Sequence, residues 1–386
     1  MTNTPQYDYI ITGAGCAGLS LTMHLVHSNK FSQKKILILD KEAKNKNDRT
    51  WCFWEKEDGL FQPVVFKQWN CLNFFSGYFS KPLNIHPYQY KLIRGIDFYT
   101  HCIKTLKEQP NITFLQAGIE KLFSNKQETG VIAEGSKTYT AQYIFNSILF
   151  SRPELKKNHY WLLQHFKGWF IKTTESVFDP SLATLMDFRT DQSNGTTFFF
   201  VLPFSANEAL IEYTLFSGEL LSGEAYEAAL KEYIEGQLKI KTYEVKEKEF
   251  GIIPMTNFSF PQRQSNIINI GTAGGQTKGS SGYTFRFIQK HAQAIVQSLL
   301  RTGHPLSVPN TASRFHFYDS VLLRILQHCQ LSGAAIFADL FKKNAPQKVL
   351  QFLDNETSLV EELRIISTLP TLPFAKAALQ HIKGGR

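Results

Sequence analysis

The sequence predicts an α/β fold, in which a Rossmann-type nucleotide-binding domain is joined to an inserted mixed or antiparallel sheet and a helical C-terminal region. Three observations predict this fold. A glycine-rich turn separates a strand-like run from a helical run near the N-terminus, alternating aromatic-rich runs fill the middle of the chain, and helical periodicity continues from about residue 312. With 386 residues, 43% of them hydrophobic, the chain can bury enough surface for two joined domains.

The N-terminal element predicts a dinucleotide site. Residues 7–12, YDYIIT, form a strand-like run that leads into the turn GAGCAG and then into the helical run LSLTMHLVHS. Gly13 permits the tight turn, Gly15 lets the backbone approach a pyrophosphate, and Gly18 lets the helix pack closely on the strand. The next apolar run, KKILILD, ends at Asp40, where this fingerprint places an acid for a ribose hydroxyl. The alternative is a glycine-rich surface turn.

A second glycine-rich element lies far downstream. The strand-like run NIINI at 266–270 is followed by GTAGG and, from residue 285, by a helical stretch. This element resembles the flavin-contacting segment of FAD-dependent hydroxylases and geranylgeranyl reductases, which implies FAD rather than NAD. Thr272 stands where those proteins have an acid, which weakens the hydroxylase interpretation. The glycines expected to contact the cofactor here are Gly271, Gly274, Gly275 and Gly282.

The remaining patterns divide the chain into three regions. Runs such as GWFIKT, TTFFFVLPF and ALIEYTLF predict strands of a substrate-binding sheet, and KVLQFLDNETSLVEELRII predicts helix. The expected regions are an FAD-binding domain of residues 1–61, 96–154 and 262–305, a substrate-binding domain of residues 62–95 and 155–261, and a helical C-terminal region of residues 306–386.

Composition limits the partners. The formal net charge of +9 favours a phosphate-bearing cofactor or an anionic membrane surface, and nucleic acid is disfavoured because the lysines are spread among acids, as in KTYEVKEKEF. The 32 phenylalanines indicate either a lining for a long apolar ligand or a phenylalanine-rich core.

The five cysteines show no metal-binding spacing, so we expect neither disulfides nor a metal, as in a reducing cytoplasm. No run of about 20 apolar residues predicts a membrane span.

One octet is unusual enough to suggest a family. Residues 47–54, NDRTWCFW, combine a charged pair with three aromatic residues, which favours a functional loop over a core strand. The octet resembles the signature that follows the second strand in bacterial lycopene β-cyclases. Further segments resemble the same family in order, as far as about residue 355: YKLIRGIDFY, LQHFKGW, MDFR, IEYTL, FGIIPMT and GTAGGQTKGSSGYTF.

The resemblance implies an activity and its requirements. It implies redox-neutral conversion of lycopene through γ-carotene to β-carotene, started by a proton and dependent on reduced FAD with NAD(P)H as reductant. Because lycopene resides in lipid, it also implies a cytoplasmic protein that associates peripherally with an anionic membrane surface. The alternatives are a flavin-dependent monooxygenase or reductase acting on an isoprenoid, and a carotenoid-binding protein without catalysis.

The resemblance also assigns site residues. Glu212, in the family's glutamate segment, is the expected catalytic acid and base, although an alternating strand could equally turn it toward solvent. Its competitors are Asp48 and Asp187, and Arg94 is expected near the cofactor. Tyr213 stands where a second glutamate is frequent. The aromatic residues expected to stabilise a carbocation are Trp51, Phe53 and Trp54.

Overall fold

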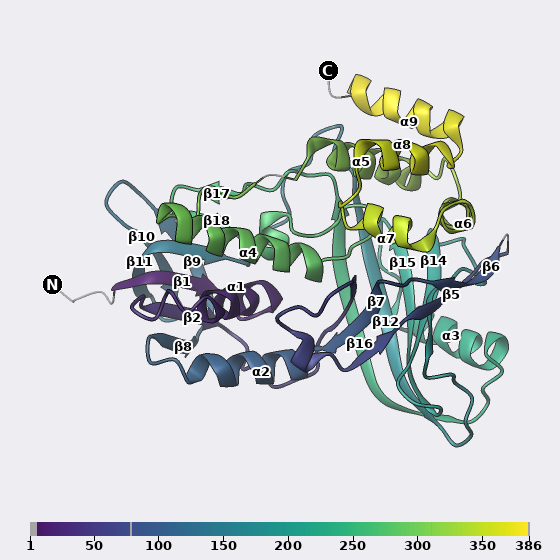
Figure 1. Ribbon diagram of the computed structural model, residues 1–386, viewed down its shortest axis with the longest axis horizontal. Helices are drawn as coiled ribbons and strands as arrows, with labels where there is room; N and C mark the ends of the chain where they lie inside the picture. The colour runs from purple at the N-terminus through teal and green to yellow at the C-terminus, as the bar shows by residue number, and fades with distance from the viewer. Residues whose placement is uncertain (1–5, 78, 310, 385–386) are drawn as a thin grey trace.

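The computed structural model describes residues 6–77, 79–309 and 311–384, so the ends of the first and last predicted regions, 1–5 and 385–386, lie outside the described residues. In Figure 1 a nucleotide-binding sheet with its helices lies on the left, a long curved sheet on the right, and a group of C-terminal helices at the upper right. The predicted α/β fold is confirmed.

The left-hand sheet has the predicted Rossmann-type core. Parallel strands β1 (Gln6–Thr12), β2 (Ile36–Asp40), β8 (Ile112–Gln116), β11 (Lys137–Asn146) and β18 (Ile267–Asn269) form its centre in the order β18-β11-β1-β2-β8. The sheet is completed by β9 (Ile119–Ser124), β10 (Thr129–Ala133) and β17 (Arg263–Gln264). Its core strands are apolar on both faces. One face is covered by three helices, α1 (Cys16–His27), α2 (Gly95–Lys107) and α4 (Phe285–Thr302), and the other packs against apolar residues of β9 and β10.

The long sheet is mixed. Its strands run in the order β16-β12-β15-β14-β13-β5-β6, and all neighbours are antiparallel except β13 and β5. Their bounds are β5 (Cys71–Phe75), β6 (Ser80–Asn84), β12 (Trp161–Thr173), β13 (Leu182–Asp187), β14 (Thr196–Pro203), β15 (Glu208–Ser217) and β16 (Tyr243–Thr256). Helix α3 (Gly223–Glu232) and the π-turn after it (Tyr233–Gln237) cover one face, and the other face belongs to a larger core shared with the C-terminal helices.

A small sheet joins the two large ones. It consists of β3 (Thr50–Glu55), β7 (Gln89–Arg94) and β4 (Lys67–Trp69), all antiparallel. The octet NDRTWCFW is therefore largely a strand, and the expectation of a loop is wrong from Thr50 onward. Because side chains alternate along a strand, Trp54 enters the core of the long sheet while Phe53 enters the core of the nucleotide-binding domain.

The C-terminal region is helical, as predicted, but one expected helix is divided. Its helices are α5 (Ser313–Gln327), α6 (Gly333–Lys343), α7 (Pro346–Leu353), α8 (Leu359–Ser367) and α9 (Thr371–Gly384). The run predicted as one helix is broken between α7 and α8, where Ser358 and Glu361 form a capping box that starts α8. Within the described residues, no helix combines the length and apolar character needed to cross a membrane.

Candidate active site

The first glycine-rich turn has the geometry that a bound pyrophosphate requires. Gly13 has a φ of 96°, and a Cβ on Gly18 would lie 2.0 Å from the carbonyl oxygen of Gly13, so both positions require glycine. At Gly15, by contrast, a Cβ would meet nothing within 4 Å, and no side chain caps the helix that begins at Cys16. The turn therefore leaves open space in front of the N-terminal N–H groups of α1, where an anion is stabilised.

Asp40 lies at the end of β2, beside this turn. Its carboxylate accepts hydrogen bonds from the backbone N–H groups of Ala14 at 2.6 Å and Glu42 at 2.7 Å, and Lys44 lies 3.2 Å away. These contacts fix the carboxylate at the edge of the sheet next to the glycine-rich turn.

The second glycine-rich element lies against the first. A Cβ on Gly271 would lie 2.8 Å from the Cβ of Ala17 in α1, and β18 runs parallel to β11 next to β1. Gly274 is packed against the carbonyl oxygen of Asn269, and Gly275 has a φ of 75°. The segment 271–274 is a 3-10 turn, so the long helix α4 starts only at Phe285.

Gly282 connects the nucleotide-binding domain with the long sheet. It has a φ of 72°, and a Cβ at this position would lie 1.8 Å from the amide oxygen of Gln164 on β12. Arg94 is placed differently: at the end of β7, its guanidinium binds Asp97 at 2.6 and 3.0 Å and covers the ring of Phe66 at 3.9 Å. The first glycine-rich turn, Asp40 and Gly271 therefore lie together and form a cradle, whereas Gly282 lies against β12 and Arg94 is engaged beside the start of α2.

Glu212 is on β15, on the face of the long sheet that is turned away from α3. Its Cα is paired with Gly168 on β12 and with Phe200 on β14. The carboxylate is partly buried, and Oε1 accepts a hydrogen bond from the hydroxyl of Thr214 at 2.7 Å. The alternative that Glu212 simply faces solvent is therefore not what the structure shows.

A second glutamate, which the sequence analysis did not select, lies next to Glu212. Glu249 on β16 is paired with the same residue, Gly168, from the other side of β12, and it is 6% exposed. Its Oε2 accepts a hydrogen bond from the hydroxyl of Thr50 at 2.7 Å. A Cβ on Gly168 would lie 2.9 Å from Cγ and 3.0 Å from Oε1 of Glu249, so the absence of a side chain at Gly168 leaves room for the two carboxyl groups.

The pKa of each carboxyl group is raised. Burial raises the pKa of Glu212 well above 4.5, and the neighbouring carboxyl of Glu249 raises that pKa further. Burial also raises the pKa of Glu249, against the hydrogen bond from Thr50, which favours its ionised form. An acid with these properties can hold a proton near neutral pH.

Aromatic and sulfur groups from other motifs surround the pair. Burial raises the pKa of Cys52 and of Tyr283, and the negative charge of Glu212 raises both pKa values further. The hydroxyls of Tyr283 and Tyr90 lie 3.5 Å apart, and Trp54 meets the ring of Tyr283 edge-on. The site thus combines β15 and β16 with β3, β7 and the loop before α4.

The other expected site residues lie elsewhere. Asp187 is completely buried on the opposite, α3-facing side of the long sheet, where Arg189 binds it at 2.7 and 2.9 Å and the hydroxyl of Tyr233 donates to it at 2.7 Å. Asp48 is exposed, just before β3. Neither carboxylate is brought together with Glu212.

The three aromatic residues of the octet also separate. Trp51 and Phe53 point into the nucleotide-binding domain, where Trp51 contacts Phe98 at 5.2 Å and Phe53 stacks on Phe285 at 4.4 Å. Trp54 enters the other core, where it contacts Tyr283, so the three rings do not lie together, and a role in stabilising a carbocation stays a prediction for each of them.

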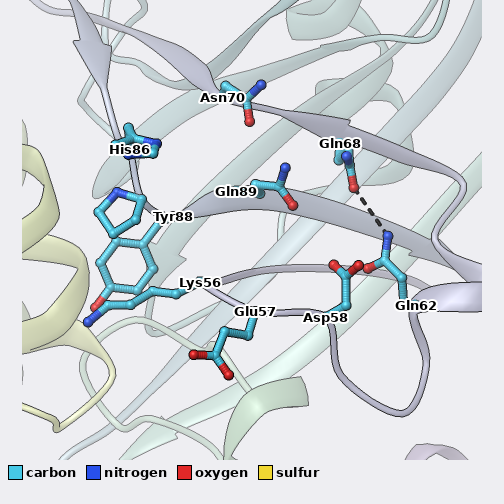
Figure 2. Close-up of a pocket in the computed structure, with 10 residues that line it drawn as sticks. Lys56, Glu57, Asp58, Gln62, Gln68, Asn70, His86, Tyr88 and Gln89 are labelled. Carbon is cyan, nitrogen blue, oxygen red and sulfur yellow. Dashed lines mark hydrogen bonds between the residues drawn. The ribbon is translucent and has the colours of Figure 1, made fainter.

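A hollow of about 550 Å³ lies beside the small sheet, and neither Glu212 nor Glu249 lines it (Figure 2). Its lining is polar, and Asp58 and Gln62, which face it, also bind the ammonium of buried Lys91. Such a lining does not suit an apolar ligand. Among the side chains that the structure describes, no group of three or more histidine, cysteine, aspartate or glutamate residues is placed to hold a metal ion.

Comparison with known proteins gives a family and distant relatives. The family model described as lycopene cyclase protein matches residues 8–379. The chloroplastic neoxanthin synthase of Solanum tuberosum is 23% identical over 319 residues, covering 77% of this chain and 61% of that protein. That of Solanum lycopersicum is 23% identical over 331 residues, covering 77% and 62%. The chain thus spans about three fifths of the length of these curated relatives.

Solved structures share the fold across the whole chain. A geranylgeranyl bacteriochlorophyll reductase-like protein from Thermoplasma acidophilum has a TM-score of 0.68 at 11% identity, covering 97% of this chain and 99% of that one. A flavoprotein/dehydrogenase from Cytophaga hutchinsonii has a TM-score of 0.64 at 12% identity, covering 99% and 100%. The flavin-dependent brominase Bmp2 has a TM-score of 0.61 at 12% identity, covering 98% of both chains. At these identities the likeness shows the fold alone.

Proposed function

The chain belongs to the lycopene cyclase protein family, and on this basis we propose that it is an FAD-dependent lycopene β-cyclase that converts lycopene through γ-carotene to β-carotene. The observation that carries the proposal is the placement of Glu212. Its carboxyl group has a strongly raised pKa and lies near Tyr283, whose ring meets Trp54 edge-on. Protonation of an alkene needs an acid that stays protonated near neutral pH.

Glu212 and the aromatic residues near it each contribute to this reaction. Glu212 donates its proton to the terminal double bond of the carotenoid, and the neighbouring double bond attacks the resulting cation to close the ring. The π-faces of Trp54 and Tyr283 stabilise positive charge, and the surrounding apolar core excludes water that would trap the cation. Loss of a ring proton restores the double bond, so the hydrogen count of the substrate does not change.

The glycine cradle supports FAD as the cofactor. In this proposal the pyrophosphate lies at Gly15 and the start of α1, and Asp40 binds a ribose hydroxyl. When bound in its reduced form, with NAD(P)H as reductant, FAD would supply negative charge that favours the cation without changing the redox state of the substrate. The loop from Gly271 to Gly282 completes the cradle on the side of the long sheet.

Peripheral membrane association is part of the proposal. Helices α8 and α9 form one edge of the molecule in Figure 1 and expose several large apolar side chains: Leu359, Val360, Leu363, Leu372, Leu379 and Ile382. Lys376 and Lys383 lie on α9 among them. Exposed apolar residues flanked by lysine fit the interface of an anionic membrane, where lycopene is dissolved.

Expression in bacteria that accumulate lycopene tests the proposal. A cyclase yields β-carotene, with the molecular formula of lycopene, and Glu212→Gln abolishes the product. A product that has gained oxygen would identify a flavin-dependent monooxygenase acting on an isoprenoid. Unchanged lycopene that copurifies with the chain would identify a carotenoid-binding protein.

A further inference from the structure

Glu249 is a buried carboxyl group that the proposed mechanism does not use. We propose that Glu249 is a positioning residue that shares a single proton with Glu212 across Gly168, so that the pair carries one negative charge and Glu212 keeps its proton at neutral pH. The use of this proton in cyclisation rests on the proposed function, whereas the sharing of the proton does not.

The register of three strands creates the pair. Glu212 on β15 and Glu249 on β16 are both paired with Gly168 on β12, so all three residues point to the same face of the sheet. Since a Cβ on Gly168 would lie 3.0 Å from Oε1 of Glu249, this oxygen lies directly over the glycine, between the two outer strands. Any larger residue at 168 would occupy the space through which the carboxyl groups meet.

One buried oxygen of the pair has no hydrogen-bond partner among the described residues, and this observation points to the proton. Oε2 of Glu249 is bound by Thr50, and Oε1 of Glu212 is bound by Thr214. Oε1 of Glu249 is buried and accepts no hydrogen bond from any residue that the structure describes. Leaving a buried carboxylate oxygen unsatisfied is costly. A protonated Glu212 can supply the missing donor, because its O–H would bind the unpartnered oxygen.

The charges around the pair favour one proton rather than none. Two carboxylates this close in a buried site cannot both ionise without strong repulsion. Positive charge compensates this repulsion only weakly. The cation that favours the ionised form of Glu249 is Arg49, which is exposed and therefore screened by water. The other titratable groups facing the pair are neutral or acidic: Cys52, Tyr283 and Glu247.

The shared proton balances over the reaction. When Glu212 donates its proton to the alkene, the pair changes from one negative charge to two, and the substrate becomes a cation. The second charge stabilises that cation in a site of low polarity. The proton later lost from the ring returns to the pair and restores a single negative charge, so the balance of proton transfer needs no further acid or base.

Infrared titration of the FAD-loaded protein without carotenoid tests the shared proton. The signal is the carbonyl stretch of protonated carboxyl groups, compared in the wild type, Glu212→Gln, Glu249→Gln and the exposed control Glu244→Gln. We expect one protonated carboxyl group to persist through neutral pH in the wild type and the control, and to be lost in Glu212→Gln. In Glu249→Gln we expect its midpoint to fall by on the order of one pH unit or more, because the like charge is gone.

The pH dependence of cyclisation supplies a second measurement. It would not change if Glu249 had only a structural role. The alkaline limb of the pH profile in Glu249→Gln should shift to lower pH, in step with the infrared midpoint. A wild type without a protonated carboxyl group at neutral pH, or an unchanged midpoint in Glu249→Gln, would overturn the shared proton. If the infrared result is as expected but no variant, including the wild type, forms a ring, the proposed function fails and the shared proton is supported.

Discussion

The indole ring of Trp54 meets the phenol ring of Tyr283 edge-on, with 4.5 Å between the ring centroids. The indole N–H donates to the backbone carbonyl of Leu350 in α7 at 3.1 Å, which fixes the orientation of the ring. This contact joins two segments more than 200 residues apart, one from the small sheet and one from the loop before α4. Together they form the aromatic wall beside Glu212.

Glu212→Gln should nearly eliminate cyclisation while FAD stays bound. The amide keeps the shape of the side chain but cannot deliver a proton, and general acid catalysis is commonly worth about 10²–10⁴-fold. The measurement is the carotenoid product formed per flavin. Asp48→Asn and Asp187→Asn are the parallel variants, and a dead Asp48 or Asp187 amide with bound flavin, beside an active Glu212 amide, would refute the assignment.

The free energy of unfolding should fall as pH rises above the unfolded pKa of Glu212, near 4.5. Glu212 has a pKa above 4.5 in the folded state, so between the unfolded and the folded pKa the folded protein binds more protons. Stability is therefore fully present below the unfolded pKa and decreases above it, by up to about 1.4 kcal/mol for each pH unit. Denaturant unfolding at several pH values measures this slope, which should be smaller in Glu212→Gln. An equal slope in both proteins would contradict the raised pKa.

Gly168→Ala should lower both stability and cyclisation. The new methyl group would lie 2.9 Å from Cγ of Glu249 and 2.9 Å from Cδ1 of Leu210, and overpacking of this kind costs about 1–3 kcal/mol. The control is Gly218→Ala after β15, where a Cβ meets nothing within 4 Å. Unfolding and product formation are measured for both variants. If Gly168→Ala had wild-type stability and wild-type product formation, the space left by the missing side chain at residue 168 would not be needed.

Gly15→Val and Gly18→Val should fail in different ways. A Cβ at Gly15 meets no atom within 4 Å, so the variant should fold but lose the flavin, because valine fills the approach of the pyrophosphate. A side chain at Gly18 would collide with the backbone of Gly13, at a cost of about 3 kcal/mol or more. Flavin absorbance and thermal unfolding separate the two effects. A flavin-loaded Gly15→Val protein would contradict the assigned phosphate site.

Replacing Leu372 and Leu379 of α9 with glutamine should weaken binding to anionic vesicles. Burying a leucine is worth about 1.5 kcal/mol or more, so each replacement should reduce binding about tenfold. Co-sedimentation at low and high salt measures the effect. The matched control is Leu220→Gln next to α3, which is also exposed. Equal losses in α9 and in the control would argue against this face as the membrane contact.

Much of the fold could be predicted from sequence because its signals are local. The glycine spacing and the apolar runs predict β1, α1 and β2, and long alternating runs predict β12, β14 and β15. The pairing of strands is not local, so the position of Gly168 between two glutamates could not be predicted.

Glu249 was missed because its strand contradicts the usual pattern. In the segment KEKEFGII, Phe250 and Ile252 are 44% and 46% exposed, whereas Glu249 is buried. A pattern-based prediction places the aromatic and aliphatic residues inside and the glutamate outside. A buried acid between more exposed apolar residues is the kind of local inconsistency that marks functional sites.

The alternation of side chains along β3 makes its length and register strict. Thr50, Cys52 and Trp54 face the carboxyl pair, while Trp51 and Phe53 fill the other core. Inserting or deleting one residue within this strand would exchange the two sets, leaving Glu249 without its threonine and placing bulky rings beside it. We therefore expect insertions and deletions in related sequences to be absent from Thr50–Glu55 and to occur in the exposed turn that follows, around residues 56–59.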